Sequence, residues 1–105
     1  MQKLRNKISD TLIEMGLNPT LKGFTYILEA LMYMNENNVD LTKLRTCDLY
    51  ERVAEKLDVE PGAVKHAIRY TNNRIDRHAP KTIELLGDRH KPVKYTLQLL
   101  YLRIK

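Results

Sequence analysis

The chain has 105 residues, of which 43 % are hydrophobic and 30 % are charged. That length can bury one hydrophobic core without disulfides or metal ions, and the composition excludes the disordered class. Crossing a bilayer takes about 20 consecutive apolar residues, and no run of that kind occurs. The N-terminal residues also lack the apolar stretch of a secretory signal. We therefore expect one soluble domain, comprising residues 1–105, in the cytoplasm and with no membrane partner.

Cysteine and histidine are too few to predict a structural metal centre. The single cysteine, Cys47, cannot form an intrachain disulfide, and a zinc site would need most of its ligands from three scattered histidines. We expect Cys47 to be a small, half-buried helix residue, and we predict no metal site and no cofactor.

Charge is distributed unevenly along the chain. Residues 1–60 contain 8 Lys and Arg against 10 Asp and Glu, a net charge of −2, whereas residues 61–105 contain 10 against 3, a net charge of +7. A polyanion that docks on the second half would gain from the release of counterions. The alternative is a solvated basic face that only keeps the protein soluble.

Helical periodicity predicts two helices in the first 36 residues. In residues 3–15, apolar side chains recur every three or four positions, and Gly16 follows as a C-terminal cap. A longer helix over residues 20–36 has the same period and would form the centre of the core. Three charged residues fall largely off its apolar face: Lys22, Glu29 and Glu36.

The next segment predicts a short turn followed by a third helix. Residues 40–44 are enough for one helical turn. Either Thr46 or Asp48 can cap the helix that follows, since Asp48 and Glu51 have the capping-box spacing. We expect this helix to end near Leu57.

Proline marks the starts of three further helices. Pro61 is placed for the first turn of a helix over about residues 61–75. Prolines also begin predicted helices over residues 80–86 and 92–104. Because the chain shows no β-alternation, the predicted fold class is all-α, a single domain of five to six helices.

Residues 50–69 have the pattern of two helices joined by a tight turn, and we predict a helix-turn-helix over about residues 48–76. Such a corner is stable only when its inward positions are apolar and one of them, here Ala54, is small. The turn carries Asp58, which tolerates a left-handed backbone better than most residues. The other predicted inward residues are Val53, Leu57, Val59, Val64, Ala67 and Ile68, of which Val59 would plug the turn.

The inward set leaves a polar and basic face on the second helix. Its outward residues, predicted to reach base edges in the major groove, are Gly62, Lys65, His66, Arg69 and Asn73. Arginine offers two parallel donors to guanine, and histidine and asparagine donate or accept. The basic residues that follow are predicted to contact phosphates: Arg74, Arg77, Lys81, Arg89, Lys91 and Lys94. Double-stranded DNA is therefore the predicted partner.

Three segments, 22–30 (KGFTYILEA), 49–54 (LYERVA) and 64–69 (VKHAIR), resemble the C-terminal effector domain of the stage-zero sporulation response regulator family. In that family a Lys-Gly-aromatic helix precedes a helix with Leu-Tyr-x-x, Ile or Val, and Ala. A recognition helix of the type Val-Glu-Arg-Ala-Ile-Arg follows. Residues 86–87 (LG) and 91–92 (KP) match as well, and the resemblance covers nearly the whole chain.

The resemblance implies a six-helix domain that binds short DNA boxes, as a dimer or as tandem copies, and that switches transcription by contacting RNA polymerase. It places the base contacts on Lys65, His66 and Arg69. Two features depart from the family pattern. Lys65-His66 stands where Glu-Arg is usual, which puts the preferred DNA sequence in question, and the connector at residues 77–80 is shorter than usual. A receiver domain of about 120 residues does not fit in the chain, which is therefore expected to be either an isolated effector domain of a larger protein or a stand-alone relative without phosphorylation control.

Two other classes of function compete with DNA binding. A helical adaptor that never touches DNA would use the late apolar residues as a partner surface, although such a stripe more often packs on its own core. These residues are Val93, Leu97, Leu100, Leu102 and Ile104. An enzyme is not predicted, because the helix carboxylates Glu51 and Glu55 have no histidine beside them and would pair with neighbouring cations. His78 and His90 are expected to be exposed polar residues.

Overall fold

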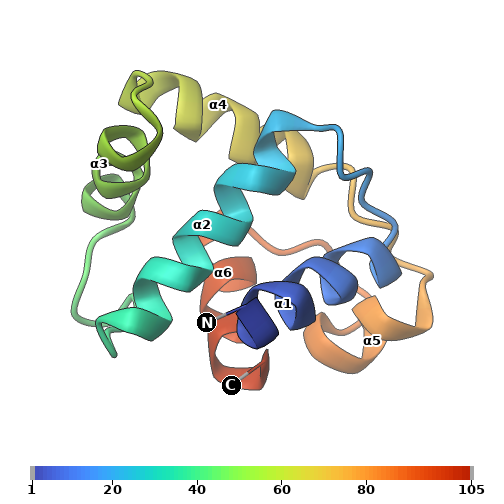
Figure 1. The fold of residues 1–105 in the computed structure, drawn as a ribbon. Coiled ribbons are helices and arrows are strands. Elements are labelled where there is room, and N and C mark those ends of the chain that lie inside the picture. Colours follow the sequence, from blue (N-terminus) through green and yellow to red (C-terminus); the bar gives the residue numbers. More distant parts are fainter. Residues whose placement is uncertain (1, 105) are drawn as a thin grey trace.

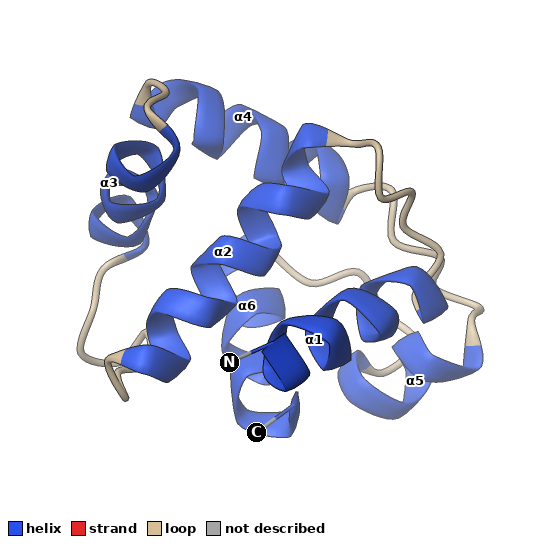
Figure 2. Cartoon of the chain, in the orientation of Figure 1, coloured by secondary structure: helices blue, strands red, loops and turns tan. Residues whose placement is uncertain are grey.

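The computed structural model describes residues 2–104, and within them it contains six α-helices and no strand (Figures 1 and 2). This confirms the predicted all-α class. The helices are α1 (Gln2–Glu14), α2 (Lys22–Glu36), α3 (Thr46–Leu57), α4 (Pro61–Asn72), α5 (Pro80–Leu86) and α6 (Val93–Ile104).

The helix α2 lies at the centre of the fold. Figure 1 shows it crossing the middle of the molecule, and α1, α3, α4 and α6 all pack against it. Because α2 has neighbours on most sides, its buried residues extend around most of its circumference and include Tyr26, Met32 and Met34. The short helix α5 packs against α1 and α6, on the side of the molecule opposite the α3–α4 turn (Figure 1).

Glycines end two of the helices as predicted. Gly16 and Gly87 have φ angles of +88° and +85°, in the left-handed region that other residues rarely adopt. The chain can therefore reverse directly after α1 and after α5. Between α2 and α3, residues 40–44 form one hydrogen-bonded turn, in which the Leu44 N–H donates to the Asp40 carbonyl at 3.0 Å.

Two predicted helix ends are wrong. α3 has Arg45 at its N-cap position and no side-chain cap, because Thr46 and Asp48 both lie inside its first turn. Asp48 instead forms an ion pair with Arg45, at 3.2 Å. α4 ends at Asn72, three residues before the predicted end at residue 75. The chain turns after Asn72, and the Asp76 N–H donates to the Met15 carbonyl at 2.9 Å.

The single cysteine and the last helix also test the predicted burial. Cys47 is exposed and not half-buried, because it lies in the first turn of α3 on the side away from the core. In α6, three of the late apolar residues are buried in the core, namely Leu97, Leu100 and Ile104. Val93 is half-buried and Leu102 is exposed, so most of this stripe belongs to the domain itself.

Candidate nucleic-acid interface

A three-residue turn, 58–60, joins α3 to α4. Asp58 has φ 57° and ψ 51°, the left-handed conformation that the sequence predicts for it. The Val59 N–H donates to the Ala54 carbonyl at 3.0 Å, which closes the last turn of α3. Pro61 then opens α4 at a position where its missing N–H has no partner to lose. The turn residues thus fix the direction in which α4 leaves α3.

The buried side of the α3–α4 pair follows the predicted pattern with one exception. Four inward residues are buried: Val53, Ala54, Val64 and Ile68. Leu57 and Ala67 are half-buried against the same core. The prediction for Val59 is wrong, since its side chain is 36 % exposed. The left-handed Asp58 and the backbone hydrogen bonds close the turn, so Val59 lies at the rim and does not plug it.

The position of α4 on the domain depends on its crossing with α2. A Cβ atom added to Gly23 of α2 would overlap the Ala67 carbonyl oxygen and the Thr71 side chain of α4. Only glycine lets the two backbones approach this closely. The Lys-Gly-aromatic segment of α2 therefore has a structural reason for its glycine.

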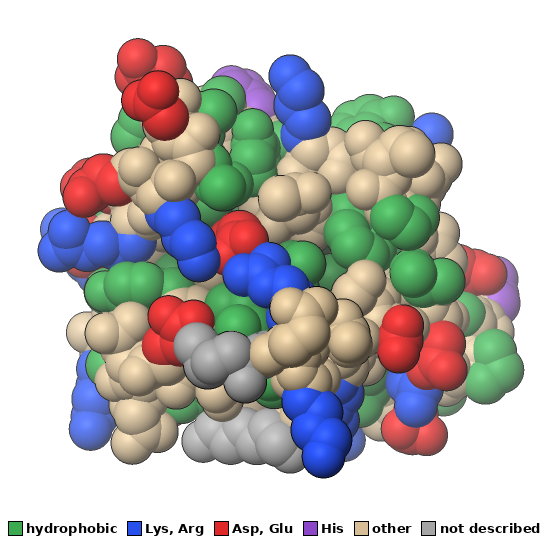
Figure 3. Space-filling model, viewed as in Figure 1, with side chains coloured by type: hydrophobic (Ala, Val, Ile, Leu, Met, Phe, Trp, Pro, Cys, Tyr) green, Lys and Arg blue, Asp and Glu red, His purple; other side chains and the backbone are tan. Residues whose placement is uncertain are grey.

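The outward side of α4 is polar and basic. The predicted base-reading residues Gly62, Lys65, His66 and Arg69 are all exposed, and so is Asn73 directly after the helix. The sequence of α4 contains no Asp or Glu. In Figure 3, histidine and Lys or Arg side chains stand along the edge that α4 forms, while acidic side chains gather over the α3–α4 turn. The exposure of these residues is confirmed, and their contact with bases stays a prediction.

Most of the predicted phosphate-contacting residues continue this basic surface. Arg74 and Arg77 follow α4, with Arg74 stacked 5.1 Å from the centre of the Tyr70 ring. The other three lie in the α5–α6 loop and in the first turn of α6: Arg89, Lys91 and Lys94. None of these five cations forms an ion pair with a carboxylate within residues 2–104. Their charges are available to an external anion.

Lys81 differs from the other predicted phosphate contacts. It lies in α5, and its Nζ is 3.5 Å from a carboxylate oxygen of Glu84 and 3.5 Å from one of Glu14. The charges of Glu84 and Glu14 raise the pKa of Lys81. This lysine holds α5 to α1, and two neighbouring carboxylates compete with any phosphate for it.

A polar contact that the sequence analysis missed holds the α5–α6 loop beside α4. Asn72 is 4 % exposed, and its Nδ2 donates to the Lys91 carbonyl at 2.8 Å. The loop and α4 enclose a cleft of about 280 Å³, whose lining includes Lys65, Arg69 and His90. The signal for Asn72 was a polar residue on the inward face of an amphipathic helix, one turn after Ile68.

The comparison with known families decides the identity of this basic domain. The model of the family described as sporulation initiation factor Spo0A C terminal matches residues 8–96 of the chain. The chain belongs to this family. Its domains are DNA-binding effector parts of a sporulation response regulator, and the family is not a catalytic one. The chain is thus a DNA-binding regulator in general terms, and the resemblance drawn from residues 22–30, 49–54 and 64–69 is confirmed. No solved structure matches the chain.

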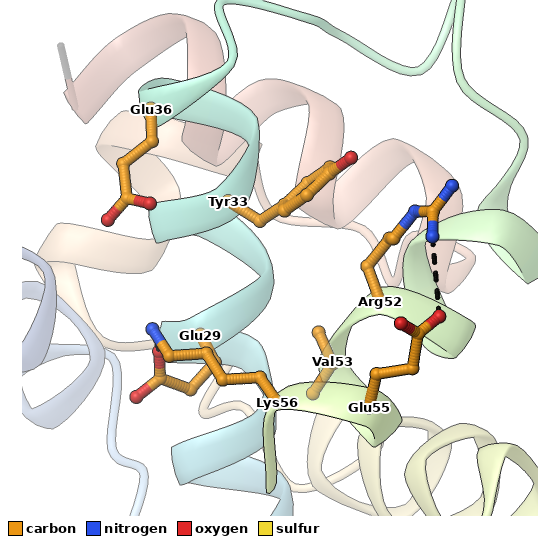
Figure 4. Close-up of a pocket in the computed structure, with 7 residues that line it drawn as sticks. All are labelled: Glu29, Tyr33, Glu36, Arg52, Val53, Glu55 and Lys56. Carbon is orange, nitrogen blue, oxygen red and sulfur yellow. Dashed lines mark hydrogen bonds and ion pairs between the residues drawn. The ribbon is translucent and has the colours of Figure 1, made fainter.

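A second cleft lies between α2 and α3, and an ion pair between the two helices lines it. It has a volume of about 340 Å³, and Figure 4 shows Lys56 of α3 reaching towards Glu29 of α2. Glu29 is predicted to lie off the apolar face, but it is only 7 % exposed. Its two oxygens accept from Arg5 of α1 at 2.8 Å and from Lys56 at 2.9 Å. The separation of these partners in sequence explains why the periodicity of α2 did not reveal them.

Electrostatics accounts for a charged Glu29 at this depth. Burial raises the pKa of Glu29, but hydrogen bonds from Arg5 and Lys56 outweigh this effect and leave the pKa below its usual value. The same hydrogen bond raises the pKa of Arg5. Beside them, Arg52 pairs with Glu55 at 3.3 Å, the dashed contact in Figure 4. Glu29 thus ties α1 and α3 to α2, whereas the Arg52–Glu55 pair lies within α3.

None of the helices within residues 2–104 is both long and apolar enough to cross a membrane. Across the same residues, no three His, Cys, Asp or Glu side chains gather as metal ligands.

Proposed function

We propose that the protein is a sequence-specific transcriptional regulator that reads the major groove of double-stranded DNA with α4. The observation that carries this proposal is the two-sided character of the helix. One side is fixed by burial on α2 and α3, and the other presents cations that no carboxylate within residues 2–104 neutralises. A helix held in this way can enter a groove without rearranging the domain.

The side chains on α4 have the chemistry that base edges require. Arg69 can form two parallel hydrogen bonds with guanine, and Lys65 can donate to the same acceptors with less geometric restriction. His66 can donate to or accept from a base edge. Gly62 has no side chain and faces open space, with nothing within 4 Å of the position that its Cβ would take, so the start of the helix can approach the groove closely. Asn73 would reach a base at the other end of the helix.

The cations outside α4 would fix the domain on the DNA backbone. We assign phosphate contacts to Arg74, Arg77, Arg89, Lys91 and Lys94. Neutralising several phosphates releases counterions, so affinity for any duplex should fall steeply with salt. Lys81 was predicted as a sixth contact, and its two carboxylate neighbours make it the weakest of the set.

Other features of the proposal rest on the family. We infer that residues 1–105 act as one effector domain in the cytoplasm, as a dimer or as tandem copies on DNA. We also infer that it binds RNA polymerase and acts without catalysis or a cofactor. Because Lys65-His66 replaces the usual Glu-Arg of the family, the preferred DNA sequence should differ from that of relatives with the usual pair.

The test begins by selecting bound duplexes from a random pool. Affinity is then measured by fluorescence anisotropy for the selected duplex and for a scrambled one. Arg69→Ala should cost about 1–3 kcal/mol of binding free energy on the selected duplex and little on the scrambled one. As a control, Arg77→Ala should weaken both duplexes alike and reduce the salt slope by about 1. Equal weakening of both duplexes by Arg69→Ala would contradict base reading by this residue.

A second selection tests the departure from the family. When Lys65 and His66 are replaced by Glu and Arg, the selected sequence should change at the bases that these positions read. An unchanged sequence would remove these two residues from the reading set.

A further inference from the structure

The cleft between α4 and the α5–α6 loop has an unusual lining. Its floor is formed by Tyr50 of α3 and Asn72 of α4, both of which are buried. Lys65 and Arg69 stand on the α4 side and His90 stands on the loop side. The remaining lining residues are Asn73, Pro92 and Val93, and no Asp or Glu is among them. The cleft is thus open, polar and free of negative charge.

Hydrogen bonds hold the loop side of the cleft in place. The Lys91 carbonyl accepts from Asn72 Nδ2 at 2.8 Å and from Thr96 Oγ1 at 3.5 Å. His90 directly precedes this anchored carbonyl. His90 is exposed and lines this cleft, and the backbone beside it is tied to α4.

The charged side chains that line this cleft with His90 are cations, and the exposed Asp88, two residues before His90, does not line it. Lys65 and Arg69 line it from α4, and Arg89 and Lys91 are the neighbours of His90 in the loop. The other titratable group that lines the cleft is the phenol of Tyr50, whose pKa is raised by burial although the charge of Arg69 opposes this. On its other side, His90 lines a hollow with Tyr95. This concentration of positive charge favours an anion in the cleft.

We propose that this cleft receives one backbone phosphate of the bound duplex and that protonated His90 is a ligand of that phosphate. The inference rests on the proposed function, because the cleft opens beside Lys65 and Arg69 and the strand that they read would pass it. Lys65 and Arg69 supply positive potential from the α4 side while their ends reach the bases.

Protonation of His90 makes DNA binding depend on pH. Imidazole gains its proton between about pH 8 and pH 5, so the cation that faces the phosphate is present at low pH and lost at high pH. Binding should take up a proton, and affinity should fall as pH rises. One charge-assisted hydrogen bond of this kind is expected to change affinity about tenfold between pH 5.5 and pH 8.

The experiment measures duplex affinity by anisotropy from pH 5.5 to 8 at constant ionic strength, with the full chain. His90→Gln should remove the part of the pH dependence that the selected and the scrambled duplex share, because a phosphate contact ignores sequence, whereas His66 would act on the selected duplex alone. His90→Lys should bind tightly at every pH. His78→Gln is the matched control and should behave like the parent chain, since His78 is exposed but does not line the cleft. Circular dichroism checks that each variant is folded.

Several outcomes would overturn the proposal. One is an unchanged pH profile in His90→Gln. Another is a loss of affinity in His90→Gln that is confined to the selected duplex, since a phosphate contact ignores sequence. The two proposals fail separately. If α4 does not read bases, the selected and scrambled duplexes bind alike while the effect of His90 persists. If only the cleft is wrongly assigned, Arg69→Ala still discriminates between them.

Discussion

The two helices on either side of the 58–60 turn treat their charges in opposite ways. In α3, Arg52 pairs with Glu55 and Lys56 reaches the buried Glu29 of α2. In α4 there is no acidic residue, and neither Lys65 nor Arg69 has an ion pair within residues 2–104. The two helices have similar lengths and share one hydrophobic core, so the difference is confined to their polar faces.

The cations of α3 are paired within the domain, whereas those of α4 face solvent without a partner carboxylate in residues 2–104. In α3, Arg52 is neutralised by Glu55 of the same helix, and the Lys56–Glu29 pair stabilises the packing of α3 on α2. The cations of α4 form no ion pair within residues 2–104 and remain available to a polyanion. Charge alone would not separate these roles, because lysine and arginine occur in both helices. The presence or absence of a nearby carboxylate does.

The largest expected effect on stability comes from disrupting the close crossing of α2 and α4 at Gly23. Gly23→Ala would force a Cβ atom into the Ala67 carbonyl and the Thr71 side chain, so α2 and α4 must move apart. We expect a loss of about 3 kcal/mol in the free energy of unfolding, measured by urea denaturation. The control is Gly62→Ala, where nothing lies within 4 Å, and its stability should be unchanged or slightly higher. Equal stability of the two variants would refute the close crossing.

The second effect comes from removing the charge that holds α3. Glu29→Gln should lower the free energy of unfolding by about 2 kcal/mol at neutral pH, since it loses charge-assisted hydrogen bonds to Arg5 and Lys56. Glu55→Gln is the control. Its ion pair with Arg52 has side chains that are 68 % and 54 % exposed, so we expect a change below about 0.5 kcal/mol.

The pH dependence of the Glu29 effect has a definite sign. Its pKa is lower in the folded protein than in the unfolded chain, so ionised Glu29 stabilises the fold above the usual glutamate pKa of about 4.3. This contribution disappears as pH falls through the lower, folded pKa. Urea denaturation at several pH values should show the parent chain and Glu29→Gln converging in acid. A constant difference down to pH 2 would contradict the role of the charge.

The smallest effect concerns the turn between the two helices. Asp58→Gly should raise the free energy of unfolding by about 0.5 kcal/mol, because glycine adopts the left-handed conformation at no steric cost. Asp58→Asn is the matched control, since it removes the same charge but keeps a side chain. Thermal denaturation should rank glycine above asparagine. The reverse order would indicate that charge and not backbone strain decides this position.

Prediction from the sequence succeeded where the signal is local. Glycines after α1 and α5, a proline at the start of α4 and the three- to four-residue apolar period are sufficient to place six helices. The tolerance of Asp58 for a left-handed backbone and the outward direction of Lys65, His66 and Arg69 follow from the same local rules. The N-cap of α3 failed, since Arg45 pairs with Asp48 and leaves that carboxylate inside the helix. The predicted burial of Val59 was wrong because backbone hydrogen bonds close the turn without its side chain.

Sequence alone therefore determined the all-helical class, the exposure of the outward face of α4 and the positive charge of that face. Only the tertiary structure decided which charges are already used. Lys81 and Lys94 are both lysines near the start of a helix, but only Lys81 meets carboxylates from its own helix and from α1. The burial of Glu29, the anchoring of the α5–α6 loop by Asn72 and the place of His90 in the cleft were decided in the same way. Each depends on segments that lie far apart in the chain and meet only when the core forms, and no local period records such a meeting.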